Sequence, residues 1–476
     1  MKKAAKKIIV MVVVIPFLYF LFDPTLTAGK CPCDSEEQVV ETSYNCADNQ
    51  RRSLPEELSA SLRRDFSREG TTGRRRIFQK RSPEPWRNIV AKRQAQFAAN
   101  PKDPQFARLS MVRRATAERR VISANETDPI DGLLTEWWCS SNGVPDEFDR
   151  MWMTTIGTTV KSGTTPYVYL FSYLGDDDET TLNTCSDMLE RQEGISADEV
   201  YWIQDFETDA FWIRDFGPLF VRDIETQELS IEDPLYYPGR PLDDAEPADF
   251  ASRIGVPLSE FNLYFEGGNF LPNGGGLCIA SSVLLEANPH YTESEIREMF
   301  RLELGCENLV IVKALDDWAT GHVDMWLAWA NRTTLLVGEY TPQQDRINHS
   351  IIEENINNKL TGLVDPETGE PIKIVRIPMP SNCPPNLNYT WPKEPPAAPV
   401  CPGLPSRFRV WRTYLNVVPV NGKLLMPVYA QDKIYEEEAK KIWTNLGFDV
   451  VTVKADAITP LAGQLHCITK TMDAPK

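Results

Sequence analysis

A unit of two strands and a helix recurs along the chain from about residue 130, and this repeat constrains the fold more than any other feature. Each unit has an apolar strand with polar residues at one end, a Gly/Asn turn, a second apolar strand and a helical stretch. Such a unit is too small to bury its own apolar face, so the repeat predicts an α/β fold of similar blades around a common axis. The clearest strand pairs are FWIRDFGPLFVRD, NLYFEGGNFLPNGGGLCIASS, HVDMWLAWANRTTLLVGEY and TYLNVVPVNGKLLMPVYA.

Helical patterns follow several of these strand pairs. They begin at Thr292, Arg346 and Ile434. In the first pattern, Glu295 stands three residues after Thr292, which is the spacing of a capping box. One further helix is expected at 88–98, before the repeat begins.

Residues 1–28 have the order of a secretory signal. Four Lys precede an apolar run from Ile8 to Phe22, and small residues follow, with cleavage expected after Ala28. This run is short for a spanning helix, so a cleaved signal is favoured over an uncleaved membrane anchor. We therefore expect a secreted or extracytoplasmic protein, and the 10 Cys suit an oxidising compartment.

The segment 29–130 is basic and lacks sustained periodicity. Within it, residues 51–120 hold 19 Lys/Arg and 7 Asp/Glu, although the whole chain has a net charge of -18. We expect a mostly disordered linker or pro-region, with a contact to anions or a membrane surface as the alternative. The remaining chain is strongly acidic, which disfavours nucleic acid as a partner and favours cationic substrates. Residues 131–476 are then the catalytic domain.

Polar residues that packing does not explain stand at the ends of the expected strands. They are Asp215 among aromatics, Glu266 before two Gly, the pair His322 and Asp324, and Cys467. We expect His322 and Asp324 to share one face of a strand, because residues i and i+2 point the same way. Each residue alone has an ordinary structural explanation, such as a turn cap or an inert buried thiol. Together, on a chain with only 4 His, they suggest one reactive site.

A Cys, a His and two Asp have the chemistry to deiminate a guanidinium group. Two carboxylates hold the planar cation by paired charge-assisted hydrogen bonds, and a thiolate adds to its central carbon. An imidazole then protonates the departing ammonia and accepts a proton from the incoming water. The carboxylates should also raise the pKa of the thiol. We therefore expect the thiolate to form on substrate binding, or to exist as a minority thiolate–imidazolium pair.

The sequence resembles the family of Porphyromonas-type peptidylarginine deiminases and agmatine deiminases, within the guanidino-group-modifying (pentein) superfamily. The resemblance implies an α/β propeller of five ββαβ-like units with five-fold pseudosymmetry. It also implies hydrolysis of a guanidine to a ureido group and ammonia through a covalent Cys thioether, without a redox cofactor or catalytic metal. The matching stretches are WIRDFGP (212–218), EGGN (266–269), GHVDM (321–325), TYLNVVPVNGKLLMPVY (413–429) and GQLHCIT (463–469).

The resemblance assigns the central roles to four residues. Cys467 is the nucleophile and His322 is the general acid and base. Asp215 and Asp324 grip the guanidinium group.

Three further positions receive supporting roles from the same resemblance. Trp212 lines the pocket, Asn416 positions the substrate or the thiol, and Glu266 is either a wall of the site or a partner of the residues in it. No metal is needed for the reaction. A structural calcium ion would suit the acidic surface, but the sequence contains no EF-hand loop.

The segment YYPGRPLDDAEP (236–247) bears on the substrate, because it resembles the R-P-x-D-D region of the peptidylarginine branch. Arg240 could reach a substrate carboxylate, and the alternative is an ion pair with Asp243 or Asp244. Pro238 stands where that branch has a second arginine. We expect deimination of arginine in peptides or proteins, with agmatine deimination to N-carbamoylputrescine as the alternative. An arginine-binding protein or an amidinotransferase could use the same residues, and product analysis separates these readings.

Overall fold

The computed structural model describes most of the chain after residue 84. The described residues are 85–102, 120–140, 143–172, 178–237, 239–317, 319–382, 409–430, 433 and 435–475. The expected signal at 1–28 and much of the basic segment lie outside them. Among the described helices, none has the length and apolar character needed to cross a membrane.

The described strands form five sheets that share one pattern. In each sheet a first strand pairs antiparallel with a second, and the chain then passes through helical structure to a third strand parallel to the second. This is the strand–turn–strand–helix repeat that the sequence predicted. The first sheet contains β5 (Leu219–Asp223), β6 (Leu229–Leu235) and β7 (Leu258–Tyr264), and the second contains β8 (Leu271–Pro272), β9 (Leu277–Ser281) and β10 (Asn308–Val312). The third contains β11 (Leu327–Asn331), β12 (Thr334–Glu339) and β13 (Lys373–Pro378), and the fourth contains β14 (Val418–Val420), β15 (Lys423–Val428) and β16 (Asp449–Lys454). The last contains β17 (Thr469–Asp473), β2 (Ile130–Cys139) and β3 (Thr165–Ser172). Two short strands, β1 (Val121–Ile122) and β4 (Tyr201–Ile203), extend the first and last of these sheets.

Helices make the connections from the second to the third strand. The helices expected from Thr292, Arg346 and Ile434 are confirmed, and the capping box is present because Thr292 and Glu295 each accept a hydrogen bond from the other's backbone N–H. A helix also confirms the prediction at 88–98. The connecting helices are α7 (Glu147–Lys161), α10 (Pro241–Ile254), α11 (Val283–Ala287), α12 (Glu293–Glu303), α13 (Arg346–Asn355) and α14 (Glu436–Asn445). Helix α8 (Asp178–Glu193) instead links β3 to β4, and the helix at 88–98 is α5 (Trp86–Ala99), which precedes the strands.

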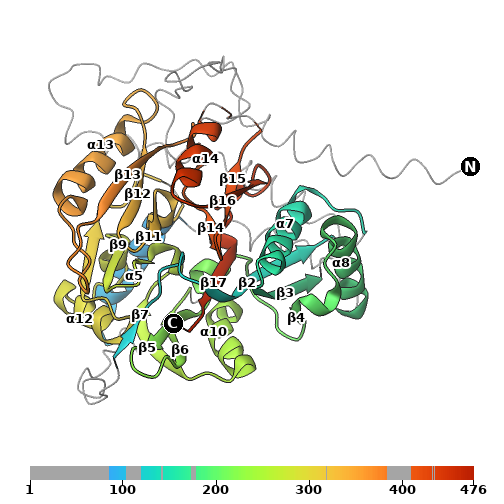
Figure 1. Cartoon of the computed structure of the whole chain (residues 1–476). Coiled ribbons are helices and arrows are strands. Elements are labelled where there is room, and N and C mark those ends of the chain that lie inside the picture. Colours follow the sequence, from blue (N-terminus) through green and yellow to red (C-terminus); the bar gives the residue numbers. More distant parts are fainter. Residues whose placement is uncertain are drawn as a thin grey trace, which may run out of the picture. The chain divides into compact units, whose positions relative to one another are not determined.

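The last strand of the chain pairs with the first long one. β17 runs antiparallel to β2, with Thr469 opposite Thr135 and Met472 opposite Gly132. Figure 1 shows the red β17 beside β2. The final sheet is therefore completed by residues from opposite ends of the described chain.

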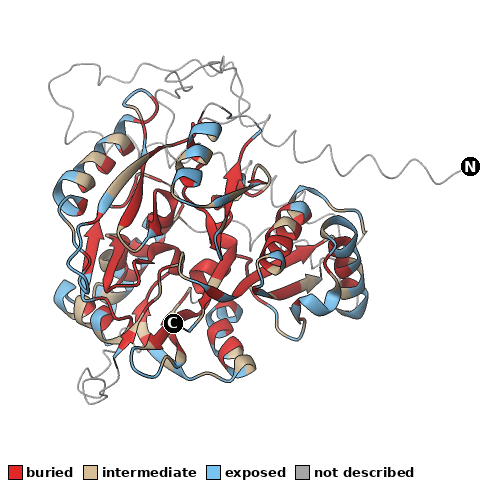
Figure 2. Ribbon diagram, in the orientation of Figure 1, coloured by how far each residue is buried: buried red, intermediate tan, exposed pale blue. Residues whose placement is uncertain are grey.

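Apolar side chains fill the strands and the inner faces of the helices, while the outer helix faces are exposed (Figure 2). Two disulfides tie helical or loop segments to strands: Cys139 at the end of β2 bonds to Cys185, and Cys278 in β9 bonds to Cys306. Among the described cysteines, Cys467 alone is free, and it is buried.

Short helical turns precede the first strand of four sheets, and they carry the polar residues singled out in the sequence. The expectation that His322 and Asp324 lie in a strand is wrong. His322 instead caps a 3₁₀ turn that contains Asp324, because the Asp317 carboxylate accepts backbone N–H bonds from residues 319–321 and bends the loop. The turns are α9 (Ile213–Phe216), η3 (Gly267–Asn269), η4 (Val323–Met325) and η8 (His466–Ile468).

The folded body also begins earlier than the expected boundary at residue 131. Strand β1 pairs with β5, and helix α5 packs in a cluster of buried residues with Tyr264 and Val283. Part of the segment 29–130 therefore belongs to the folded domain.

Candidate active site

Three polar side chains converge above one glycine. A Cβ atom built on Gly268 would lie 2.5 Å from His322 Nδ1, 2.8 Å from Asp215 Oδ1 and 3.2 Å from Asp324 Oδ2. Its neighbour Gly267 has no room either, because a Cβ there would lie 2.1 Å from the carbonyl oxygen of Arg214. The two glycines of EGGN thus let the backbone approach a cluster of charged groups closely.

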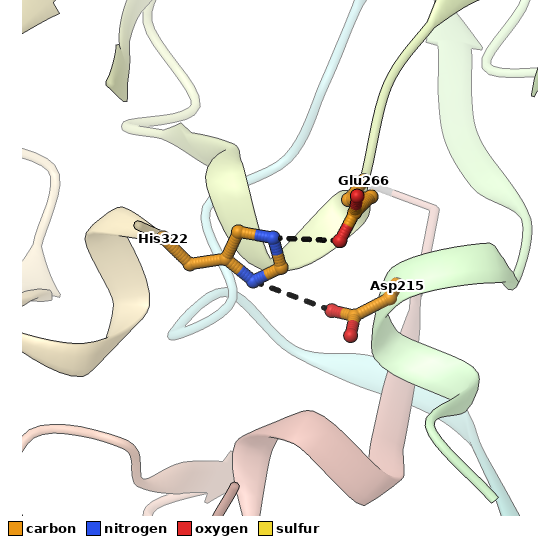
Figure 3. A group of neighbouring side chains, drawn as sticks. All are labelled: Asp215, Glu266 and His322. Atoms are coloured by element: carbon orange, nitrogen blue, oxygen red, sulfur yellow. Dashed lines mark hydrogen bonds and ion pairs between the residues drawn. The ribbon is translucent and has the colours of Figure 1, made fainter. Parts of the chain in front are cut away.

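Asp215, Glu266 and His322 form a buried triad (Figure 3). His322 Nε2 lies 2.9 Å from Glu266 Oε2, and His322 Nδ1 lies 3.5 Å from Asp215 Oδ1. The hydroxyl of Tyr264 donates to the other oxygen of Glu266 at 2.9 Å. One donor atom from each member of the triad lies within 4.8 Å of the others, a spacing that suits a metal ion or an organic cation.

Cys467 faces the same cluster from the turn before β17. Its Sγ lies 3.9 Å from Asp324 Oδ2 and 3.4 Å from Asn416 Nδ2. The Asn416 side-chain oxygen also accepts the backbone N–H groups of His466 at 2.9 Å and of Cys467 at 3.4 Å. Asn416 therefore holds both the thiol and the turn that carries it.

Burial and the neighbouring charges set the protonation of the site. Burial would lower the pKa of His322, but the carboxylates of Asp215 and Glu266 raise it to about 10. Burial raises the pKa of Asp215 to about 7, against the opposing charge of His322. Burial, with the charges of Asp324 and Asp215, raises the pKa of the Cys467 thiol well above its usual range. Near neutral pH the unliganded site therefore holds an imidazolium and a neutral thiol.

Several buried polar atoms in the site have no hydrogen-bond partner within the described part of the chain. They are Asp324 Oδ1 and the two atoms of the 3.5 Å ion pair, Asp215 Oδ1 and His322 Nδ1, which lack hydrogen-bond geometry. An unpaired buried carboxylate oxygen is costly unless a ligand supplies a donor. A guanidinium group carries five N–H donors in one plane and would satisfy both carboxylates at once.

Comparisons with known proteins identify the family of the chain. The family model for Porphyromonas-type peptidyl-arginine deiminase matches residues 126–473. The chain belongs to this family. An agmatine deiminase of Pseudomonas aeruginosa is 24% identical in sequence to this chain over 303 residues, which cover 58% of this chain and 77% of the relative.

Solved structures of similar proteins support the same family fold. An agmatine deiminase of C. jejuni with substrate bound has a TM-score of 0.58 and 17% identity, covering 78% of this chain and 99% of its own. An agmatine deiminase of Enterococcus faecalis has a TM-score of 0.59 and 17% identity, covering 75% and 96%. At this identity the likeness bears on the fold alone, and the fold is the mixed α/β fold of pentein-type deiminases.

The other residues proposed from the deiminase family lie around the cluster. Trp212 is buried and packs against the loop that leads to Cys467: a Cβ atom built on Gly463 would lie 2.2 Å from the Trp212 ring. Arg240 stacks on Tyr237 at 5.2 Å and lies 3.8 Å from Asp243 Oδ2, so the alternative ion pair is present but long.

Two side chains of this deiminase-family site were not predicted to take part. His466 Nδ1 lies 2.8 Å from Asp324 Oδ2, and its Nε2 lies 2.6 Å from Glu126 Oε2. The position of His466 next to Cys467, on a chain with 4 His, was a usable signal. Glu126 carried no such sequence signal, because it lies in the segment expected to be disordered and its partner His466 is 340 residues away in sequence.

Helix α5 lies outside the family match and contacts the site loops. The Trp86 backbone N–H donates to the Ala319 carbonyl at 2.8 Å, and the Trp86 ring lies 3.1 Å from the Cβ position of Gly321. The Arg93 guanidinium lies 4.5 Å from the ring of Tyr264, which bonds to Glu266. This helix therefore supports the loops that carry His322 and Glu266.

We predict that Gly268→Ala lowers kcat/KM for deimination by about 10²-fold, because the new methyl group displaces three polar side chains from their common point. Steady-state kinetics and a thermal melt measure activity and folding together. Gly239→Ala is the matched control, since a Cβ there meets nothing within 4 Å. Equal activities of the two variants would refute the importance of this convergence.

We predict that Glu266→Gln moves both limbs of the pH profile of kcat/KM to lower pH. The wild-type profile should rise as Asp215 ionises, with a pKa of about 7, and fall as His322 loses its proton, with a pKa of about 10. The Glu266 charge raises both pKa values, so its removal lowers both. Glu354→Gln, at an exposed ion pair with Lys313, should leave the profile unchanged. An unshifted Glu266→Gln profile contradicts the proposed coupling.

Proposed function

We propose that this protein hydrolyses a guanidinium group to a ureido group and ammonium, with Cys467 as the covalent nucleophile. The observation that carries the proposal is the convergence of Asp215, Asp324 and His322 on one point near Cys467, where the Oδ1 atom of each Asp accepts no hydrogen bond from the described residues. A planar cation with several N–H donors fits this set of groups better than a neutral or anionic ligand does.

The first step forms a carbon–sulfur bond. The bound cation neutralises the carboxylates of Asp215 and Asp324, which lowers the pKa of the Cys467 thiol. The thiol therefore releases its proton to solvent on binding and regains one after the product leaves. The thiolate then attacks the guanidinium carbon. The His322 imidazolium gives its proton to one nitrogen, which leaves as ammonia and yields an amidino thioether.

The second step releases the product. Neutral His322 takes a proton from a water molecule, and the resulting hydroxide adds to the amidino carbon. The carbon–sulfur bond breaks, the thiolate returns and the ureido product leaves. The ammonia carries away the remaining proton as ammonium, so charge and atoms balance without a metal or redox cofactor. Glu266 keeps the imidazole oriented through both steps.

Agmatine is the first substrate candidate. The curated relatives that match this chain, such as those of Pseudomonas aeruginosa and Medicago truncatula, are named agmatine deiminases. The acidic character of the chain, with a net charge of -18, also favours a substrate with two positive charges.

Peptidyl-arginine is the second candidate, and Arg240 is the observation that favours it. The Arg240 side chain is 14% exposed, and its charge acts on Glu266 within the site. A buried cation near the site would attract a substrate carboxylate and repel the amine of agmatine. Export would bring the enzyme into contact with peptides. The order of a secretory signal in residues 1–28 (Lys, an apolar run, then small residues) and the two disulfides support export.

We also propose that the five sheets surround one axis as the blades of a propeller. Their shared strand pattern and the pairing of β17 with β2, which joins the two ends of the described repeat, support this arrangement. Such a ring would bring the turns before β5, β8, β11, β14 and β17 to one end of the axis.

We predict that wild type converts agmatine or an Arg-terminated peptide to its ureido product, and that Cys467→Ala lowers kcat by about 10³-fold or more. Mass spectrometry of both substrates, incubated in parallel, identifies the product and the substrate class. Brief acid quenching of wild type should also capture an amidino adduct on Cys467. Wild-type rates in Cys467→Ala would exclude this thiol as the nucleophile.

We predict that Arg240→Ala raises KM for the Arg-terminated peptide by about tenfold and leaves or lowers KM for agmatine, because only the peptide offers a carboxylate. Arg301→Ala, an exposed ion-pair variant on α12, is the control. A similar change for both substrates would show that Arg240 does not recognise the carboxylate.

A further inference from the structure

The ring of His466 lies between two carboxylates. Its Nδ1 is 2.8 Å from Asp324 Oδ2 and its Nε2 is 2.6 Å from Glu126 Oε2. His466 and Asp324 are both buried, with 3% and 2% of their surface exposed, and the Glu126 side chain is 18% exposed. A continuous chain of hydrogen bonds therefore runs from Glu126 to Asp324, which stands beside Cys467.

His466 occupies one oxygen of Asp324 and leaves the other unpaired. Oδ2 accepts from His466 and faces Cys467 Sγ at 3.9 Å, while Oδ1 has no partner within the described residues. A carboxylate can rotate about its last side-chain bond, and a hydrogen bond to one oxygen fixes that rotation. The direction of the unpaired oxygen is thus set by His466.

Glu126 joins this chain to the opposite side of the site. It forms an ion pair with Arg214, whose Nε donates to the His466 carbonyl at 3.3 Å. Arg214 directly precedes Asp215 on α9. One carboxylate therefore ties together the turns that carry Asp215 and Asp324, which come from two different sheets.

Both ring nitrogens of His466 face carboxylate oxygens, so both need a hydrogen. Burial and the charge of Arg214 oppose protonation, but Glu126 and Asp324 raise the pKa of His466 overall. Lys470 on β17, whose pKa is lowered to about 7, mainly by burial, acts on Glu126, and the Cys467 thiol faces Asp324. An imidazolium thus donates to both neighbours.

We propose that His466 and Glu126 are positioning residues for the clamp: Glu126 holds the His466 ring, and the ring orients the Asp324 carboxylate, which faces Cys467, toward the guanidinium group. This inference rests on the proposed function for its reaction, but it makes a separate prediction about binding. Neither residue touches the substrate in this assignment.

Two substitutions at His466 separate orientation from packing. The amide nitrogen of Asn coincides with Nδ1 of His, so His466→Asn keeps a donor toward Asp324. The amide nitrogen of Gln coincides with Nε2, so His466→Gln keeps the contact with Glu126 and loses the one with Asp324. Both variants remove the charge and the imidazole ring, which makes each the control for the other.

We predict that His466→Asn retains at least about tenfold more kcat/KM than His466→Gln, as expected when a single contact orients a reacting group. In the Cys467→Ala background, calorimetry with agmatine should show about tenfold weaker binding for His466→Gln than for His466→Asn. A thermal melt checks that both variants fold. Equal values for the two variants, or the reverse order, overturn the proposal.

The binding measurement keeps the two proposals distinguishable. If wild type binds but does not hydrolyse any guanidine, the proposed function fails while the binding difference still tests the role of His466. If neither His466 variant folds, Glu126→Gln and Glu126→Ala replace them, since Gln retains an acceptor for His466 Nε2 and Ala does not. In that case, equal binding by the two Glu126 variants overturns the proposal, and tighter binding by Glu126→Gln supports it.

Discussion

The meeting of buried carboxylates around His322 is the interaction on which the rest of the site depends. Burying charged groups this close together has a high desolvation cost, which is offset when each group has a partner of opposite charge in the protein or in a ligand. Glu266 and Asp215 hold the imidazolium, and Asp324 is held by His466. The Oδ1 atoms of Asp215 and Asp324 accept no hydrogen bond from the described residues and can accept one from a cationic ligand. The buried negative charge of the site and its suitability for a guanidinium group thus have one cause.

Much of this arrangement was readable from the sequence, because its signals are local. Alternating apolar residues and Asn-Gly turns predicted the strand pairs, and the Thr292–Glu295 spacing predicted a helix start. The motifs around Asp215 and Cys467 named most residues that meet in the site. The conformation around His322 was not readable, because alternation in a three-residue stretch also fits a 3₁₀ turn, and the Asp317 carboxylate decides between them. The role of Glu126 depends wholly on contacts distant in sequence.

Helix α5 supports the site from outside the segment that matches the family. Trp86 and Arg93 contact the Ala319 loop and Tyr264, so a segment that the family model does not cover fixes two loops of the site. Loops that carry reactive groups are usually the least stable part of a domain. Packing a helix against them restricts their motion without adding any group to the chemistry.

The pairing of β17 with β2 has a consequence for biosynthesis. The turn with Cys467 comes directly before the strand that completes a sheet begun more than three hundred residues earlier, as the pairing of Thr469 with Thr135 requires. A ribosome synthesises β2 long before it synthesises Cys467, so the partly made chain holds an open sheet edge and lacks this thiol. Under the proposed function, a product terminated before Cys467 would lack both this thiol and the strand that completes the sheet.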